Sequence, residues 1–402
     1  MSYWKNTTTT FLDGPTVDSF GALRVTQPRT IFDSKLLSND GPLLWDRIIS
    51  GSTANYSWAS PIATYVVSSS GDYTVAQTRR RMIYEAGQSH KILMTFVLGA
   101  PAVNSTARVG YFNSTTVAPY SASYDGIYLE RDGASVNLCV GNVGIIESVS
   151  QSLWNVDPCN GSGPSGINLD FTKSQILFID FQWLGVGRIR IGFVVNGTLT
   201  YVHQFEHSNL IGGVYMTSPN HSLRYELRSS GAISSLSQIC AAVMTEGTVT
   251  NDGIVTSVSS NRAGVTVSTT DTALIGVRLR SGSLNQSIVP IDYSIISTAT
   301  SSANYQYNIC INPTINGQIN WSSSLSSSYE YARGSATSSV ANMGTVVESG
   351  WVGTTIKQST GTVLPSVLQL GSSISGSIDQ CWLVLYSLNS VSFLGSLGIR
   401  ET

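Results

Sequence analysis

Charged side chains are scarce in this sequence. Asp, Glu, Lys and Arg make up 11% of the 402 residues, and the formal net charge is −2, whereas soluble domains typically carry about 25% charged residues. The sequence therefore offers no basic region of the size that nucleic acid or an anionic membrane surface requires. Lysine is especially rare. A protein surface with so few charged side chains predicts that partner subunits cover much of that surface. The lysines are Lys5, Lys35, Lys91, Lys173 and Lys357.

Long apolar runs are also missing. The longest apolar window, from Ile92 to Val103, is about half of the ~20 residues needed to cross a bilayer, so we expect no membrane segment. The first ten residues, which include four consecutive threonines, lack the apolar core of a secretory signal peptide. This fits a protein that is assembled in a cytoplasm and later exposed to the medium.

The cysteines show no pairing motif. They are Cys139, Cys159, Cys240, Cys310 and Cys381, an odd number without any C-x-x-C spacing, so neither a zinc knuckle nor a disulfide framework is indicated. We expect five buried free thiols, with a Cys139–Cys159 bridge as the alternative.

Nucleophile and cofactor motifs are absent as well. No G-x-S-x-G elbow, G-x-G-x-x-G loop or Walker loop occurs. The histidines available as catalytic bases are His90, His203, His207 and His221. We therefore assign no catalytic, cofactor-binding or metal-binding residue.

One segment does match a metal-binding pattern. His203-Gln-Phe-Glu-His207 has the H-x-x-E-H spacing of a metalloprotease group. That chemistry requires a helix, on which residues four apart converge on one ion. Here the segment follows strand-like residues, and strand geometry would separate the two imidazoles by roughly 13 Å. We interpret them as half-exposed strand histidines.

Other chemistry-bearing groups have simpler explanations. Arg79-Arg80-Arg81 is the one basic cluster, and on a strand its side chains would alternate between faces and pair with acids or with a subunit. Asp-Gly and Asn-Asp-Gly segments favour turns, with calcium binding as the alternative. Their aspartates are Asp40, Asp125, Asp132 and Asp252.

Two groups of residues are compatible with a function in sugar cleavage or sugar binding. A glycosidase needs two carboxylates about 5–9.5 Å apart, and the candidates are Asp170, Asp180, Glu206 and Glu226. Tyr120, Tyr124 and Tyr128 could instead stack on sugar rings, although packing in a core or an interface is the simpler use of each.

The strand pattern predicts an all-β protein. Between the apolar runs Gln175–Trp183 and Arg188–Val195 lies a glycine corner, Leu184-Gly-Val-Gly187. Asn196-Gly197 then separates the second run from Thr198–His207, which is the strongest short-range hairpin signal. Short strands separated by polar turns continue along the chain, which is typical of an antiparallel sandwich or jelly roll.

The same pattern suggests three parts. Residues 1–45 read as an extended arm that reaches either a neighbouring subunit or its own domain. Residues 46–240 form a first β-sandwich, of jelly-roll or lectin-like type, and residues 241–402 form a second one. One strand, Gly71–Tyr84, and a hairpin turning at Arg131-Asp132-Gly133 belong to the first sandwich.

Several segments resemble virion structural proteins of tailed phages and large DNA viruses of aquatic hosts. They are Phe20–Lys35, Gln77–Arg81, Val109–Phe112, Gly126–Glu130, Gly163–Gly166 and Trp183–Gly187, and together they span about residues 17–230. The resemblance implies a capsid-associated, decoration, tail or fibre component, and it brings no catalytic residues.

The sequence therefore predicts a non-enzymatic virion structural protein without cofactors. Its expected partners are other virion proteins and further copies of itself, a trimer being one option. The alternative function is a module on the particle surface that binds a host glycan or receptor through loops at one end of the first sandwich. A glycan-cleaving enzyme is the third hypothesis.

Overall fold

The computed structural model describes residues 17–21, 23–24, 27–114, 123–247, 253–281, 286–298, 304–323, 327–353, 358–362 and 369–401. In these residues the chain is built from antiparallel strands, and the single helical element is the three-residue 3₁₀ turn η1, Gln151–Leu153. The expected all-β class is confirmed. No helix in the described part of the chain is long and apolar enough to cross a membrane. The chain divides into two compact units, Met1–Thr250 and Asn251–Thr402.

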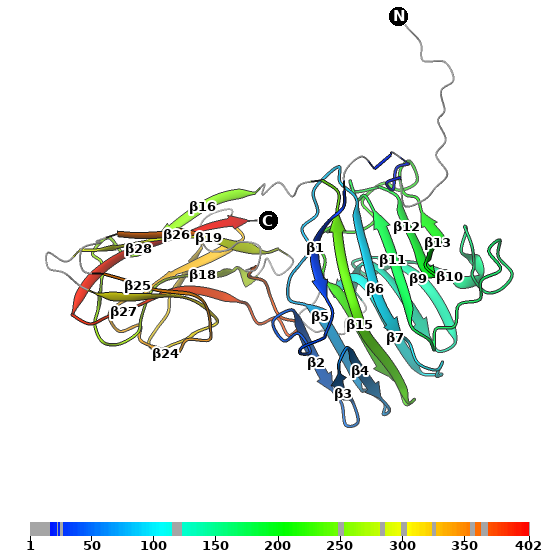
Figure 1. Ribbon diagram of the computed structural model, residues 1–402, viewed down its shortest axis with the longest axis horizontal. Coiled ribbons are helices and arrows are strands. Elements are labelled where there is room, and N and C mark those ends of the chain that lie inside the picture. The colour runs from blue at the N-terminus through cyan, green and yellow to red at the C-terminus, as the bar shows by residue number, and fades with distance from the viewer. Residues whose placement is uncertain are drawn as a thin grey trace, which may run out of the picture. The chain divides into compact units, whose positions relative to one another are not determined.

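Two sheets pack face to face in the first unit (Figure 1). In its described residues the larger sheet has eight strands, ordered β13-β12-β11-β6-β15-β4-β3 with β1 beside β15. These are β1 (Arg29–Ser34), β3 (Asn55–Ala59), β4 (Ile62–Val67), β6 (His90–Val97), β11 (Gln175–Phe181), β12 (Ile189–Val195), β13 (Thr198–Phe205) and β15 (Ser234–Thr245).

The facing sheet of this unit has seven strands among the described residues, ordered β10-β9-β8-β7-β14-β5-β2. These are β2 (Trp45–Ser50), β5 (Tyr73–Thr78), β7 (Ser105–Ser114), β8 (Tyr124–Asp132), β9 (Ser135–Asn142), β10 (Ile145–Ser150) and β14 (Leu223–Ser229).

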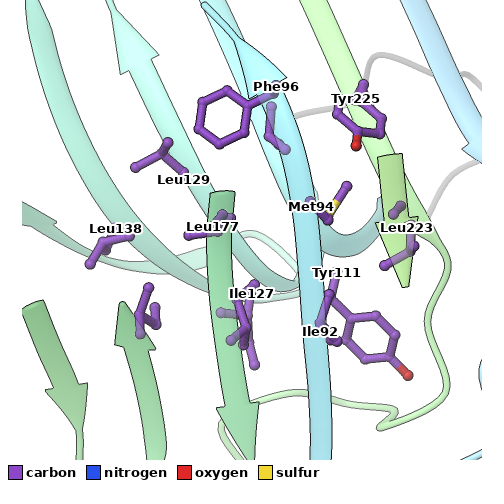
Figure 2. Close-up of a cluster of buried hydrophobic side chains, with 14 of the residues drawn as sticks. Ile92, Met94, Phe96, Tyr111, Ile127, Leu129, Leu138, Leu177, Leu223 and Tyr225 are labelled. Atoms are coloured by element: carbon purple, nitrogen blue, oxygen red, sulfur yellow. The ribbon is translucent and has the colours of Figure 1, made fainter. Parts of the chain in front are cut away.

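The core of the first unit lies between these sheets (Figure 2). Ile92, Met94 and Phe96 are spaced two apart on β6, so all three point to the same face. They meet side chains of the seven-stranded sheet such as Ile127 and Tyr225, which are equally buried. Apolar alternation on both sheets therefore defines the sandwich.

The second unit is also a sandwich. One sheet has five strands in its described part: β16 (Ile254–Ser259), β17 (Val265–Val267), β19 (Ile288–Ser297), β26 (Gln358–Thr362) and β28 (Val391–Glu401). The six described strands of the other sheet run in the order β22-β23-β18-β27-β20-β25. They are β18 (Thr272–Leu279), β20 (Tyr305–Ile311), β22 (Trp321–Ser323), β23 (Tyr329–Arg333), β25 (Thr345–Val352) and β27 (Gln380–Ser387). A small pair, β21 (Thr314–Ile315) and β24 (Val340–Asn342), completes the unit.

The Asn-Gly hairpin is confirmed. Asn196 and Gly197 have φ values of 51° and 79°, and Val195 pairs with Thr198. Positive φ at both central residues is what a type I′ turn requires. β11, β12 and β13 consequently lie side by side at one side of the eight-stranded sheet.

Two local predictions were wrong. The second hairpin turns at Gly133-Ala134, because Asp132 pairs with Ser135 and extends β8 past the expected end. The strand expected over Gly71–Tyr84 stops at Thr78. The Thr78 hydroxyl donates to the carbonyl of Arg80 and accepts from the amide of Leu223, and these local bonds end the strand.

The arginine cluster therefore lies beyond a strand end. The Arg79 side chain donates to the Pro42 carbonyl at 3.2 Å, and Arg80 donates to the Ile31 carbonyl at 2.9 Å. Arg81 is buried. The expected alternation between sheet faces was wrong, and Arg79 and Arg80 instead hold the segment that precedes β2.

The described part of the N-terminal segment packs on its own unit. β1 pairs with β15, and Phe32 joins the core. Arg24 forms ion pairs with Asp180 of β11 at 2.6 Å and with Glu246 just after β15. The sequence predicted that the first sandwich ends at residue 240. β15 continues through that position to Thr245.

The glycine corner depends on close backbone contact. The Gly187 amide donates to the Trp183 carbonyl at 2.7 Å, and a Cβ on Gly187 would lie 1.7 Å from the Gln182 carbonyl oxygen. We expect Gly187→Ala to lower the free energy of unfolding by about 1–3 kcal/mol, because the backbone must shift to relieve the overlap. Chemical denaturation measures this cost.

The matched control for Gly187→Ala is Gly212→Ala. A Cβ on Gly212 would meet nothing within 4 Å, so that variant should unfold within about 0.5 kcal/mol of the wild type. Equal stability of the two variants would contradict the steric explanation of the corner.

Candidate functional site

The two histidines of the H-x-x-E-H segment have separate partners. His203 Nδ1 accepts from the Asn155 amide at 3.0 Å, whereas His207 Nε2 lies 3.3 Å from Glu147 and its ring stacks on Tyr215. Phe205 lies between the two imidazoles. Both rings are buried, so the half-exposed setting expected from the sequence was wrong. In the residues that the structure describes, no group of three or more His, Cys, Asp or Glu is arranged to hold a metal ion.

The calcium candidates lie apart from one another. Asp125 is buried and accepts the Thr217 amide at 2.8 Å, so it holds a turn in place. Asp132 accepts from Thr106, and Asp40 accepts from Tyr56. Asp252 lies outside the described residues.

The cysteines are free thiols. Cys139, Cys159, Cys310 and Cys381 are buried, and Cys240 is half-buried. A Cys139–Cys159 bridge is not formed.

The four carboxylates named from the sequence occupy different places. Asp170 is exposed and caps its own turn at Thr172, and Glu206 is exposed after β13. Asp180 lies on the eight-stranded sheet, where it pairs with Arg24 and Arg190. Glu226 lies on the seven-stranded sheet. They do not form the paired carboxylates that a glycosidase needs.

Glu226 has a different acidic neighbour, Glu130, which the sequence analysis missed. On the sheet face turned away from the core, Arg108 of β7 donates to Glu130 at 2.7 Å and to Glu226 at 2.9 Å. Arg224 donates to Glu226 at 2.8 Å, and the Tyr124 hydroxyl donates to it at 2.7 Å. Cross-strand register brings Glu130, Arg108 and Glu226 into one row. This arrangement could be predicted only once the strand pairing is known.

Glu226 has the wrong pKa for a general acid. Burial alone would raise the pKa of Glu226, but Arg224 and Arg108 outweigh it and hold the pKa below its ordinary value. A glycosidase acid requires a raised pKa. Glu226 therefore stays ionised and neutralises the buried Arg224 and the partly buried Arg108.

Tyr124 and Tyr128 are not available to sugars. Both are 1% exposed, and their rings pack with Phe112 at centroid distances of 5.7 and 4.7 Å. Gly126 and Gly110 lie directly across the strands from Phe112 and Tyr128, which leaves room for the rings. The sugar-stacking role considered for these tyrosines was wrong, and Tyr120 lies outside the described residues.

An open aromatic surface occurs in the second unit instead. Trp351 of β25 is 58% exposed. Its cross-strand neighbour on β20 is Gln306, which in turn pairs with Tyr386 on β27. The Trp351 and Tyr386 rings meet edge to face at 6.2 Å, and the Gln306 amide donates to the Ser349 hydroxyl at 3.1 Å. We call Gln306, Ser349, Trp351 and Tyr386 the aromatic platform.

Next to the aromatic platform, another part of the same sheet face is covered by residues of the second unit. Trp382 is fully buried there among Ala332, Cys310 and the partly buried Ile315 of β21. Arg278 lies 4.2 Å from the ring centre of Trp321 at this end. The β21–β24 pair therefore covers one half of the face, and Trp351 marks the half that remains open.

Sequence signals located the platform only in part. Val346–Trp351 reads as a strand, but every strand has two faces. Whether Trp351 lies on the core face or the open one depends on its register with β20 and on the bulge in β25 near Val346. The exposure of this tryptophan could not be read without the pairing.

Comparison with known proteins gives distant structural likeness. No protein-family model matches the chain, and no curated protein matches it. The chain is similar to the Bacillus licheniformis β-glucanase, with 13% identity and a TM-score of 0.34 over 53% of this chain and 96% of the enzyme. It is similar to the Streptomyces sioyaensis endo-1,3-β-glucanase, with 9% identity and a TM-score of 0.36 over 55% and 97%.

A third similar structure is the VIP36 exoplasmic/lumenal domain in its Ca²⁺/Man3GlcNAc-bound form. The identity is 9% and the TM-score is 0.33, over 56% of this chain and 91% of that domain. At such low identities and TM-scores, the likeness assigns neither a function nor a site to this chain.

Proposed function

We propose that this chain is a non-enzymatic protein of a virion surface that binds host glycans through the aromatic platform. The observation that carries the proposal is the exposed Trp351 ring beside Tyr386 and Gln306, on three adjacent strands. The apolar face of a pyranose ring stacks on an aromatic face. A carboxamide and hydroxyls at its edge then orient the sugar by hydrogen bonds.

The platform has the polar groups that this recognition needs. Gln306 uses one N–H on Ser349, and a carboxamide has a second N–H and a carbonyl oxygen to offer. The Tyr386 hydroxyl adds a group that both donates and accepts. No charged side chain belongs to the platform, so it favours a neutral sugar.

The non-enzymatic part of the proposal rests on the carboxylates. Glu226 and Glu130 share Arg108 on the seven-stranded sheet, and the pKa of Glu226 is shifted away from that of a proton donor. Glu226, held in this way, stabilises the sheet and does not serve as a proton donor at neutral pH.

The placement on a virion rests on the resemblance of Phe20–Lys35 and the related segments, together with the low charge of the chain. The competing function is a structural subunit that binds no glycan. Locating the chain in a density map of whole particles tests the placement directly. A position inside the shell would contradict a role in attachment.

A glycan array with the full chain tests the binding function. We expect reproducible binding by the wild type and at least a tenfold weaker affinity for Trp351→Ala, a loss of about 1.4 kcal/mol. The matched control is Phe20→Ala, since Phe20 is an aromatic side chain of the first unit with 49% exposure.

Each outcome of the array is informative. Loss in Trp351→Ala with retention in Phe20→Ala supports the platform. Silence of the wild type would favour the purely structural role, and unchanged binding by Trp351→Ala would place any glycan site elsewhere.

A further inference from the structure

β25 ends its sheet with an open edge in the described part of the second unit. It pairs with β20 on one side, and the sheet order stops there. Natural edge strands are usually protected by lysine, proline, short length or inward-pointing charge. β25 has eight residues without Lys or Pro, and its protection is limited to one inward-pointing charge, Glu348, and the bulge near Val346. Val346, Val347 and Trp351 are 43%, 43% and 58% exposed.

We propose that this edge is where two copies of the chain associate, with β25 pairing antiparallel to β25 around a two-fold axis at Ser349. An isologous interface requires a strand that is complementary to itself. The sequence of β25 indicates that its partner is a second β25, as the residues on the two faces of the strand show.

The register with β20 fixes the two faces of β25. Trp351, Ser349 and, beyond the bulge, Val346 lie on the outer face, whereas Glu348 and Gly350 lie on the core face. Residues opposite each other in an antiparallel pair share a face. A pair centred on Ser349 therefore places Gly350 opposite Glu348 of the second copy, and Trp351 opposite its Val347, the residue at the bulge.

This register avoids like charges. Glu348 is the one charged residue of β25, and centring the pair on Glu348 would set two carboxylates face to face, which is destabilising. Centred on Ser349, each carboxylate faces a glycine and keeps its hydrogen bond from the Tyr293 hydroxyl at 2.7 Å. Aromatic opposite β-branched residues form a favourable cross-strand pair.

The pairing also duplicates the aromatic platform. A two-fold axis perpendicular to the sheet keeps both outer faces on the same side, and the two Trp351 residues stand four residues apart along the strands, roughly 13 Å. One branched or extended glycan then reaches both Trp351 rings, a step that rests on the proposed function. The pair closes as a dimer, in place of the trimer considered from the sequence.

Disulfide trapping tests the register. In an antiparallel pair, opposite Cα atoms lie about 4.5–5.5 Å apart, which suits a disulfide. Oxidation should convert Ser349→Cys in the full chain to a covalent dimer of two 43.0 kDa chains. The wild type and the control Ser323→Cys, an exposed position on β22 at the opposite edge, should remain single chains on a non-reducing gel.

Light scattering over a range of concentrations tests the surface itself. We expect a concentration-dependent dimer for the wild type and at least a tenfold weaker association for Val347→Lys. The matched control, Ile145→Lys on the exposed strand β10, should associate like the wild type. A monomeric wild type, or a dimer that survives Val347→Lys, would overturn the proposal.

The two proposals fail separately. A wild type that dimerises through β25 but binds no glycan refutes the proposed function alone. A chain that binds glycan while remaining monomeric at all concentrations refutes the edge pairing alone.

Discussion

Replacing Glu226 by Gln should lower the free energy of unfolding of the first unit by about 3–5 kcal/mol, because it leaves buried positive charge without its counter-charge. Glu226 is fully buried, and Arg224 and Arg108 both donate to it. Denaturant unfolding, monitored by hydrogen exchange of peptides from the first unit, measures this loss of unfolding free energy.

The matched control is Glu330→Gln in the second unit. Its pair with Arg278 has a 2.7 Å contact, but both side chains keep solvent exposure. A partly exposed pair contributes only about 0–1 kcal/mol. Equal losses from the two variants, or a loss below 1 kcal/mol from Glu226→Gln, would refute the role assigned to the buried Glu226.

The same carboxylate predicts the direction of the pH dependence. Its pKa is held below the ordinary value of 4.5, since Arg224, Arg108 and the Tyr124 hydroxyl outweigh burial. A lowered pKa means that the folded state binds fewer protons than the unfolded state, so stability is complete above about pH 4.5 and falls as the pH drops towards the folded pKa. Glu226→Gln should remove this part of the acid sensitivity when unfolding is compared at about pH 7 and about pH 4.

Replacing Trp382 by Ala should destabilise the second unit by about 3–5 kcal/mol, because a fully buried indole leaves a large cavity. The ring packs closely over Gly276, where an added Cβ would lie 2.3 Å from it, and Trp321 meets it edge to face at 5.5 Å. The melting temperature of this unit should drop by on the order of 10 °C.

Trp351→Ala is the control for Trp382→Ala, since the same residue type stands on the same sheet face but is largely exposed. It should change stability by less than about 0.5 kcal/mol. Hydrogen exchange should confine the Trp382→Ala effect to peptides from residues 251–402, because each unit has its own core. Loss of protection in the first unit would refute independent cores.

Local chemistry explains which parts of the fold could be predicted. The Asn196-Gly197 turn was predictable because positive φ at both positions is a property of those two residues. The early end of β5 was not, since it depends on the Thr78 hydroxyl bonding to Leu223, a residue far along the chain. Arg79 and Arg80 then turn to distant carbonyl groups that no local pattern reveals.

The sites were harder to predict than the fold. Tyr128 and Trp351 both read as aromatic residues on strands, yet one is buried opposite a glycine and the other is open. Glu130 became relevant only through its register with Arg108. Pairing between strands decides both cases, and a single sequence does not encode that pairing in any short window.

The first unit also has a consequence for its own synthesis. Its opening strand, β1, hydrogen-bonds to β15, and Arg24 binds both Asp180 and Glu246. Because a ribosome delivers the chain from its amino end, β1 and Arg24 emerge before the partners that hold them, and β15 and Glu246 are among the last residues of the unit to appear. The first unit therefore completes its folding after translation has passed residue 246, and until then the nascent segment depends on chaperones or on its own solubility.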